Sequence, residues 1–340
     1  MNNEQFPLQG IIGVVGSDVG EVNQAVEHGL SCVEVRADLL VDSGHTEYAV
    51  LEIISKIRAR NLKSLFTMRR FDHGGKFSGT EKDRFDFCLR AFEAGADAVD
   101  VEWDSTSAVD LIGSNIPTIL SHHDFHQTPG PDELERLTDA MLAKMPAALK
   151  IASTATSLAD AVRMLRWVRE QESGPRRIGF AMGAYGACSR ILTTVFGAPI
   201  TYASFGESLA PGQLSISEMK SVYSREGTNS NTRLIGLLGD EEQTRQWAHQ
   251  INSSSWAKRQ NYFGIPITVD SQQELIDVAG FLKLELVFVS NETSPGFVNC
   301  SQQDIPEEGD FQIYEIGGDP TAGIGRNCTS EVKELLSAAG

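Results

Sequence analysis

Eight short runs of β-forming residues, separated by stretches of helical periodicity, fill the first 223 residues and limit the possible folds more than any other feature. The β runs lie at residues 10–15, 32–36, 64–69, 98–102, 118–121, 149–152, 177–182 and 200–203. Helical periodicity is clearest at residues 48–60, 132–145 and 158–171. Eight such units of about 27 residues predict an α/β fold, a closed parallel (β/α)8 TIM barrel, with an open doubly wound sheet as the alternative.

The chain continues past this first unit. Residues 204–213 are expected to fold over the barrel mouth as a lid, and residues 217–223 to form a short closing helix. The polar stretch 224–231 predicts a boundary between two domains, 1–226 and 232–340. β runs near 234–239, 264–269 and 284–290, with helices over 241–256 and 272–283, predict a small second α/β domain of about three strands.

The charge of the chain limits its partners. It has 340 residues with 46 acids against 29 bases, a net charge of −17. Such a chain repels phosphate backbones and anionic lipid surfaces, so neither nucleic acid nor a membrane is expected as a partner. Residues 228–340 alone hold 16 acids and 7 bases and no complete GxGxxG motif, which disfavours a dinucleotide site.

The cysteines and the hydropathy pattern predict a location. The five cysteines are odd in number, widely spaced and never arranged as CxxC, which fits a reducing compartment. The first residues resemble no secretory signal, and no stretch approaches 18 apolar residues. We therefore expect a cytoplasmic protein. Separately, we expect the chain to form a homo-oligomer, a dimer.

Ionisable residues stand at the ends of five of the predicted strands. In a parallel barrel these ends meet at one rim, where the active sites of such folds lie. One polar residue at a strand end is commonly a solvated loop entry, but packing does not explain five strands contributing to one rim. The residues are Glu34 and Arg36, Arg69, Asp100 and Glu102, His123, and Lys150.

Lys150 carries the clearest chemical signal. It lies within Leu-Lys-Ile-Ala, and a lysine facing the barrel interior would be desolvated, which lowers its pKa and makes its amine a nucleophile. An outward lysine lying between helices is the alternative. His123 ends the preceding strand, and an amine that condenses with a ketone beside an imidazole that moves protons suits elimination or aldol chemistry.

Several motifs occur in order along the predicted barrel. They are Glu34-Val-Arg36-Ala-Asp38, Phe66-Thr-Met-Arg69, Asp100-Val-Glu102, Ser121-His-His123-Asp-Phe125, Lys150-Ile, Met182-Gly-Ala-Tyr-Gly-Ala-Cys-Ser189-Arg190, Val195-Phe-Gly197 and Ala210-Pro-Gly-Gln213. Through them, residues 10 to about 223 resemble type I 3-dehydroquinate dehydratase, the Schiff-base enzyme of the shikimate pathway of aromatic amino acid biosynthesis.

The resemblance implies a substrate, 3-dehydroquinate, and a role for each matching residue. Lys150 would form an imine with the substrate ketone, and His123 would move the protons of the elimination that gives 3-dehydroshikimate. Arg190 would bind the substrate carboxylate, Gln213 would add a hydrogen bond from the lid, and Glu34, Arg36 and Arg69 would hold ring hydroxyls. Asp100, Glu102 and Met182 are expected in support. No metal or organic cofactor would be needed.

Two positions depart from the pattern of that family. His73 stands where relatives usually carry a glutamate that partners the catalytic histidine, so either Asp72 or Glu102 is expected to take over that contact. Leu209 replaces a usual Ser or Thr, and Ser208 would supply the hydroxyl only if the backbone shifts. The change at His73 predicts a slower enzyme or an altered pH profile.

The C-terminal part has a weaker resemblance, to the substrate-binding domain of shikimate dehydrogenase. Asp240-Glu-Glu-Gln replaces the usual Ser-rich turn, and residues 287–293 lack the lysine that family keeps there. We expect a degenerate remnant that serves stability, oligomerisation or partner docking.

Two other functions stay open from the sequence. One is a Schiff-base aldolase acting on sugar phosphates, which would need a phosphate site near the last two strands. The other is a binding or regulatory barrel without catalysis, in which His73 and Leu209 record loss of function.

Overall fold

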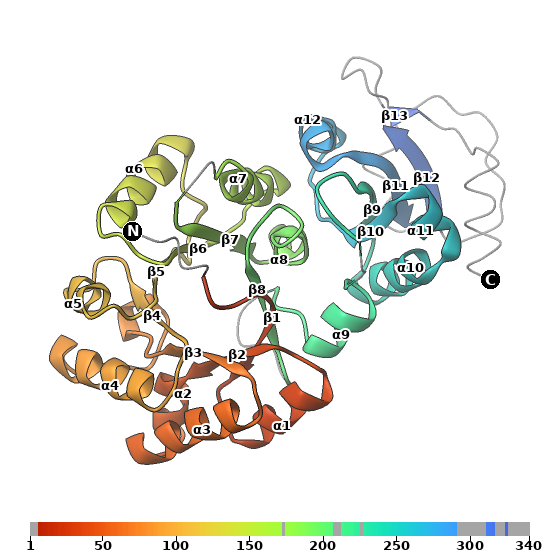
Figure 1. Cartoon of the computed structure of the whole chain (residues 1–340). Helices are drawn as coiled ribbons and strands as arrows, with labels where there is room; N and C mark the ends of the chain where they lie inside the picture. The colour runs from red at the N-terminus through yellow and green to blue at the C-terminus, as the bar shows by residue number, and fades with distance from the viewer. Residues whose placement is uncertain are drawn as a thin grey trace.

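Eight parallel strands form a nearly closed barrel with helices packed around it (Figure 1). The computed structural model describes residues 6–171, 174–206, 212–224, 227–290, 311–316 and 324–325. The strand order is β7-β6-β5-β4-β3-β2-β1-β8, and β1 pairs in parallel with both β2 and β8. This confirms the predicted TIM barrel and excludes the open doubly wound sheet. The strands are β1 (Gly10–Val15), β2 (Cys32–Arg36), β3 (Lys63–Thr67), β4 (Ala98–Glu102), β5 (Thr118–His123), β6 (Ala148–Thr154), β7 (Arg176–Met182) and β8 (Ile200–Ser204).

The barrel helices begin where side chains can cap them. Thr80 and Asp83 form a reciprocal capping box at the start of α4, and Pro131 occupies the first turn of α6, where its missing N–H costs nothing. Helix α6 ends three residues earlier than predicted, because Met145 takes a left-handed φ of 57°. The helices are α1 (Gly20–Glu27), α2 (Ala37–Asp42), α3 (Glu47–Ala59), α4 (Glu81–Glu93), α5 (Ser107–Gly113), α6 (Pro131–Leu142), α7 (Leu158–Arg169), α8 (Ala187–Leu192) and α9 (Ile216–Ser221).

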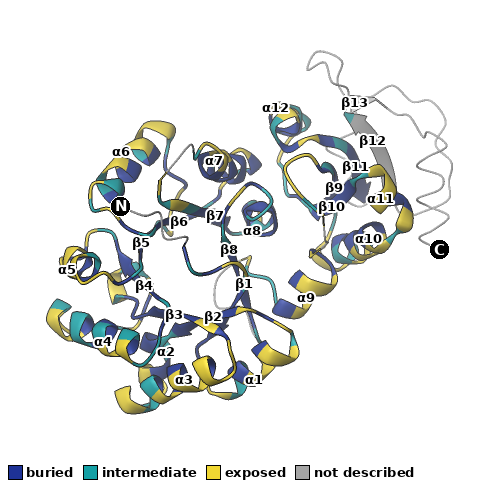
Figure 2. Ribbon diagram, viewed as in Figure 1, coloured by how far each residue is buried: buried dark blue, intermediate teal, exposed yellow. Residues whose placement is uncertain are grey.

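Alternate residues of the strands fill the barrel interior, while the intervening ones pack under the helices. The interior cluster takes every second residue, as in Ala148 and Ala152 of β6. The N-terminal residues Phe6 and Leu8 belong to this same buried cluster. Figure 2 shows the buried strands ringed by helices whose outer faces are exposed. The two-residue period therefore decides which strand residues point into the barrel.

A second, smaller sheet follows the barrel. Its order is β10-β9-β11-β12-β13, with β9, β10 and β11 parallel and β12 antiparallel to β11. The prediction of about three strands was therefore too low, because β12 comes from a distant segment. The predicted helix 241–256 is also wrong, since Ser254 is extended and divides it into two. The elements are β9 (Arg233–Leu238), α10 (Glu241–Ser253), α11 (Ser255–Gln260), β10 (Tyr262–Pro266), α12 (Gln272–Leu282), β11 (Leu284–Ser290), β12 (Phe311–Ile316) and β13 (Ile324–Gly325).

A buried amide joins the small sheet to the end of the barrel. Asn252 on α10 donates to the carbonyl of Val222, just after α9, at 2.9 Å and to that of Gly264 in β10 at 3.0 Å. Its carbonyl oxygen accepts from the Gly264 N–H at 2.7 Å. Within the described ranges, none of the helices combines the length and the apolar composition that crossing a lipid bilayer requires.

Candidate active site

Lys150 points into the barrel. Its neighbours at the two-residue period, Ala148 and Ala152, both belong to the interior cluster, and Lys150 itself is buried. Its Nζ donates to Asp100 Oδ2 at 3.0 Å and lies 4.2 Å from the ring centroid of Tyr202. Burial lowers the pKa of Lys150, while the nearby charge of Asp100 raises it. Burial has the larger effect, so the pKa lies below its ordinary value. The outward alternative is therefore wrong, and the lysine is a more available nucleophile than one in water.

Asp100 connects Lys150 to a second cation, Arg69. Arg69 donates to Asp100 Oδ1 at 2.9 Å and to Ser121 Oγ at 2.6 Å, and the Ser121 hydroxyl donates to Asp100 Oδ1 at 2.6 Å. Burial acts to raise the pKa of Asp100, but Arg69 and Lys150 together lower it to about 2. Asp100 therefore stays ionised and holds the amine and the guanidinium at fixed positions.

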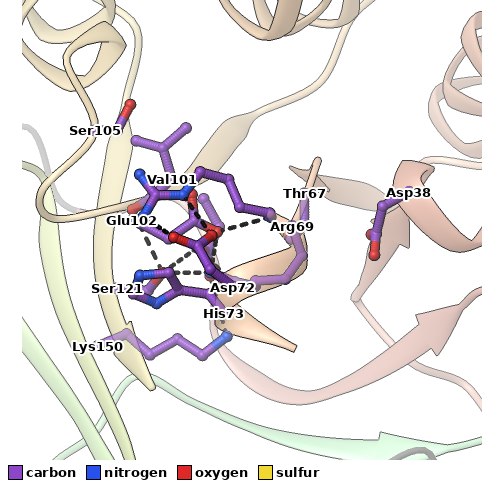
Figure 3. Close-up of polar contacts among 12 residues, drawn as sticks. Asp38, Thr67, Arg69, Asp72, His73, Val101, Glu102, Ser105, Ser121 and Lys150 are labelled. Atoms are coloured by element: carbon purple, nitrogen blue, oxygen red, sulfur yellow. Dashed lines mark hydrogen bonds and ion pairs between the residues drawn. The ribbon is translucent and has the colours of Figure 1, made fainter. Parts of the chain in front are cut away.

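Glu102 lies between two buried arginines. Its Oε1 accepts from Arg69 at 3.2 Å and from the backbone N–H of Arg70 at 3.1 Å, and its Oε2 pairs with Arg84 of α4. Arg84 is completely buried and also pairs with Glu81 at 2.9 Å. Figure 3 shows dashed contacts around Arg69, Glu102 and Ser121, with His73 and Lys150 beside them. The carboxylate is thus occupied with cations.

The other predicted residues of β2 also lie in this half of the barrel mouth. Glu34 is buried and its Oε1 accepts from the Thr67 hydroxyl at 2.8 Å. Arg36 forms a two-pronged pair with Asp38, both contacts at 2.8 Å, and Asp38 also accepts from the backbone N–H of Lys76 at 3.1 Å. Arg36 therefore already has a carboxylate partner.

His123 ends β5 at the same inward period as Ser121. Its Nδ1 is buried and has no hydrogen-bond partner, and its ring stacks on Phe125 with centroids 6.3 Å apart. Burial is the main reason that its pKa lies well below the ordinary value, and the positive charges of Arg69 and Lys150 act in the same direction. The imidazole is therefore neutral near pH 7 and can accept a proton.

Neither predicted carboxylate partner of His123 contacts it. Glu102 is occupied as described, and Asp72 pairs with Arg70 at 2.9 Å, its side chain 66% exposed. Both expectations are corrected on this geometry, because each carboxylate lies nearer to an arginine than to the imidazole. His73, in the short 3-10 turn η1 (Phe71–His73), has its Nε2 3.8 Å from Asp104 and a buried Nδ1 without a partner.

Arg190 differs from the other arginines of the barrel mouth. It lies on α8 with an exposed fraction of 3%, and its guanidinium is 4.5 Å from the ring centroid of Phe180. Among the described residues no carboxylate pairs with it, and burial lowers its pKa to about 10. A desolvated cation without an acid is suited to bind an anion from outside the chain.

Met182 and Gln213 lie near this side of the barrel, and part of the predicted lid is not described. Met182 is buried at the end of β7. Gln213 is half-buried and follows Gly212. Leu209 and Ser208, like the rest of residues 207–211, lie outside the described residues.

Two hollows of the described surface lie at opposite ends of the barrel. A hollow of about 1510 Å³ is lined by residues such as Phe6, Pro117 and Pro199, which precede strands. A smaller one, of about 400 Å³, is lined by Asp38, Met68 and Lys76 beside the ionisable groups. The ionisable residues lie at the end with the smaller hollow, where the strands have their C-terminal ends, as active-site residues do in other barrels of this type. Within the described ranges, no three His, Cys, Asp or Glu side chains are grouped to hold a metal ion.

Comparison with known proteins decides the family. The model of the type I 3-dehydroquinase family matches residues 12–230. The chain belongs to the type I 3-dehydroquinase family. It is 34% identical over 200 residues to a 3-dehydroquinate dehydratase of Dehalococcoides mccartyi, a match that covers 57% of this chain and 86% of that protein. The resemblance inferred from the motifs is thereby confirmed.

Two longer proteins are also similar to this chain. A chloroplastic bifunctional 3-dehydroquinate dehydratase/shikimate dehydrogenase of Arabidopsis thaliana is 32% identical over 226 residues, which is 64% of this chain but only 36% of that enzyme. The solved dehydroquinate dehydratase and shikimate dehydrogenase of S. pombe has a similar fold, with a TM-score of 0.55 and 21% identity over 83% of this chain and 57% of that one. This likeness of fold extends past the residues that the family model matches.

Three residues of this candidate site were assigned no role from the sequence. Tyr202 contacts the lysine, Ser121 links Arg69 to Asp100, and Arg84 neutralises Glu102. The two-residue period would have placed Tyr202 and Ser121 inside, since Ile200 and Ile119 of their strands are interior residues. No sequence signal identifies Arg84, because its pairing depends on how α4 packs on β4.

Proposed function

We propose that the barrel eliminates water from 3-dehydroquinate to give 3-dehydroshikimate, through an imine on Lys150. One observation carries the proposal: a buried, inward-facing amine 3.0 Å from Asp100 shares the barrel mouth with an unpaired imidazole and an unpaired guanidinium. Membership in the type I 3-dehydroquinase family supports the same reaction. Each of the three groups suits one part of a cyclic hydroxy-keto acid.

The first step joins enzyme and substrate. The neutral amine of Lys150 attacks the ketone carbon and a C–N bond forms. The ketone oxygen leaves as water after it takes up two protons, one from the amine nitrogen and one from solvent. The product is a protonated imine. Asp100, at 3.0 Å from Nζ, stabilises the positive charge that then stays on this nitrogen. The protonated imine is itself the electron sink, so the proposed reaction uses no metal or organic cofactor.

The second step is the elimination. His123 removes a proton from the carbon next to the imine, and the electron pair moves to the nitrogen to give an enamine. The enamine returns the electron pair and expels the neighbouring hydroxyl, which leaves as water with the proton that His123 gives back. Water then hydrolyses the imine, releases the unsaturated ketone and restores the lysine amine. One water molecule is lost overall.

The remaining residues hold the substrate in this proposal. Arg190 binds the carboxylate with two parallel hydrogen bonds, and Gln213 adds a polar contact from the segment after β8. Glu34 and Arg36 face the ring hydroxyls. Arg69 is saturated by Asp100, Glu102 and Ser121, so its support comes through Asp100 and not through a free guanidinium.

We further propose that residues 1–226 and 232–340 are two domains of a cytoplasmic protein. The separate sheets of the two parts support the division. Cys32, Cys88 and Cys188, which lie in the described part of the chain, are free and buried, which supports a reducing compartment.

The experiment that tests the proposal combines turnover with trapping. Purified protein is mixed with 3-dehydroquinate, the absorbance of the enone product is followed, and borohydride with mass spectrometry tests for a reduced adduct on Lys150. We expect product and adduct in the wild type, and a loss of at least about 1000-fold in kcat for Lys150→Ala. Lys82→Ala, which removes an exposed lysine paired with Asp86 on α4, is the matched control and keeps full activity.

Each other result has a defined meaning. Full activity of Lys150→Ala would overturn the Schiff-base mechanism. An adduct without product would show that the elimination step has failed and would direct attention to His73, and neither product nor adduct would favour a binding barrel.

A further inference from the structure

The C-terminal part of the chain packs against the barrel at the elements that follow the strand bearing Lys150. Helix α12 lies beside α7, and β10 lies beside α8 (Figure 1). Phe281 of α12 stacks on Phe196, with centroids 5.1 Å apart and planes within 16°. The guanidinium groups of Arg166 and Arg169 lie 4.6 and 4.1 Å from the centroid of the same ring. This aromatic contact anchors α12 to the barrel.

The first turn of α12 holds the start of α7. Glu274 Oε1 accepts from the backbone N–H groups of Leu158, at 2.6 Å, and Ala159, at 3.3 Å. Its second oxygen accepts from the N–H of Asp270 at 3.1 Å. A helix leaves its first N–H groups without partners, and a carboxylate there is favoured by the helix dipole. The C-terminal part thus supplies a cap to the helix that follows β6.

Asp270 holds the next loop. Its Oδ1 accepts from the hydroxyl of Tyr185, which lies in residues 183–186 between β7 and α8. Asp270 and Glu274 therefore bind two successive loops at one end of the barrel from a single turn. We name residues 270–274 the bracing turn.

The loop that Tyr185 belongs to is closely packed on its other sides. Gly186 lies so near Ala181 that a Cβ there would be 2.5 Å from its backbone carbonyl. Gly212, with a φ of 71°, has no room for a Cβ either, which would lie 2.8 Å from the carbonyl oxygen of Gly183. The loop thus contacts the residue before Gln213 directly.

Arg190 depends on the same loop for its position. It lies on the six-residue helix α8, which begins directly after residue 186. Ser189 fixes the first turn of that helix, since its hydroxyl donates to the Gly186 carbonyl at 2.6 Å and accepts from the Ala181 N–H at 2.8 Å. No carboxylate of the described residues orients the guanidinium, so its position depends on the backbone that carries it and on the Phe180 ring beside it.

We propose that the bracing turn holds positioning residues for substrate binding: Asp270, whose backbone N–H is bound by Glu274, fixes the 183–186 loop and thereby holds Arg190 and Gln213 where the substrate carboxylate is bound. This inference rests on the proposed dehydratase function. It gives the C-terminal part a role in the barrel's own site, in place of that of a passive remnant. The role concerns binding, since Lys150 and His123 lie on β6 and β5, whereas the bracing turn contacts the residues that follow β6 and β7.

The test measures kcat and KM for 3-dehydroquinate in the full chain. Tyr185→Phe and Asp270→Ala each remove the hydrogen bond between the bracing turn and the loop. We expect KM to rise about 2- to 10-fold, as for the loss of one hydrogen bond, with kcat changed less than 2-fold. Asp270→Asn keeps an acceptor and restores most of the affinity. Asp277→Ala is the matched control, because its carboxylate accepts from Gln273 on the same helix and lies away from the loop.

A double-mutant cycle separates positioning from general stability. In an Arg190→Met background, Asp270→Ala should raise KM by a smaller factor than in the wild type, because one of the two groups that it positions is gone. A merely structural effect would lower Tm and would add to the loss in that background. If Asp270→Ala fails to fold by circular dichroism, Tyr185→Phe decides the question, because it keeps the ring and removes only the hydroxyl.

The failures are distinguishable. A wild-type protein that neither dehydrates 3-dehydroquinate nor forms the Lys150 adduct would overturn the proposed function. An active wild type with Tyr185→Phe and Asp270→Ala indistinguishable in KM from Asp277→Ala would overturn the positioning role alone, as would a fully additive cycle.

Discussion

Two buried arginines at the barrel mouth lie in opposite electrostatic surroundings. Arg69 donates hydrogen bonds to Asp100, Glu102 and Ser121, and the two carboxylates compensate its positive charge. Arg190 is equally buried, with an exposed fraction of 3% for each, yet it has an aromatic ring beside it and no carboxylate among the described residues. Burial alone therefore does not distinguish their roles.

The difference indicates which of the two arginines stabilises the fold and which is available to bind a ligand. A buried charge is costly unless it is paired, so Arg69 is stabilised within the chain whereas Arg190 lacks compensation until an anion arrives. In a chain with a net charge of −17, leaving one buried guanidinium without an acid makes it a distinct site for an anion.

The largest effect is expected at Arg190. Arg190→Met removes the carboxylate contact and should lower kcat/KM by about 100-fold or more, mostly through KM. The same change should leave Tm equal or higher, because it removes an uncompensated buried charge. Steady-state kinetics and thermal unfolding of one protein preparation check both parts. A clear fall in Tm would show that Arg190 is paired within the chain after all.

The opposite pattern is expected at Glu102. Glu102→Gln removes the buried negative charge that Arg69 and Arg84 share as a partner. The free energy of unfolding should therefore fall by about 3 kcal/mol. Denaturant unfolding measures this loss. Ser114, whose hydroxyl donates to a carbonyl on the surface of α5, offers a control in Ser114→Ala, expected to change stability by less than about 0.5 kcal/mol. Equal stability of the two variants would contradict the contrast.

The smallest effect is a shift in pH dependence at His123. Burial first, then Arg69, Lys150, His73 and Arg36, hold its pKa well below 6.5. The base is lost only when pH falls through that lowered value, so the acid limb of kcat/KM should lie below pH 6.5. The unfolded chain takes up this proton at higher pH than the folded one, so stability also falls as pH drops below about 6.5.

Removing one neighbour sharpens this prediction. His73→Gln takes away one of the groups that depress the pKa of His123, and the acid limb should move up by less than about one unit. The profile of kcat/KM against pH measures it. A limb at or above 6.5 in the wild type would show that His123 is not held neutral by its surroundings.

The fold and most of the site were predictable because they depend on local patterns. Alternation of β and helical segments predicted eight strands, and positions at the ends of these strands predicted that Asp100, Glu102, His123 and Lys150 meet at one rim. These inferences need only the neighbours of each residue in sequence.

The remaining features depend on contacts between distant segments. Arg84 lies 18 residues before Glu102, on a helix whose packing against β4 no periodicity describes, and the segment that forms β12 is far in sequence from its partner β11. The expectation that Glu102 or Asp72 orients His123 failed for a related reason: each carboxylate has an arginine close by, and sequence spacing does not rank such competitors. The site roles themselves stay predictions that the proposed experiments decide.

The N-terminal residues Phe6 and Leu8 are buried in the barrel's interior cluster, and this limits how substrate and water can reach the site of the proposed reaction. With apolar side chains filling the barrel axis, substrate and water reach the lysine from the same side. Every oxygen that enters or leaves during one turnover then shares a passage with the substrate. In a reaction run in water labelled with oxygen-18, the unlabelled ketone oxygen in newly formed product would measure how often the water released on imine formation stays to hydrolyse the imine.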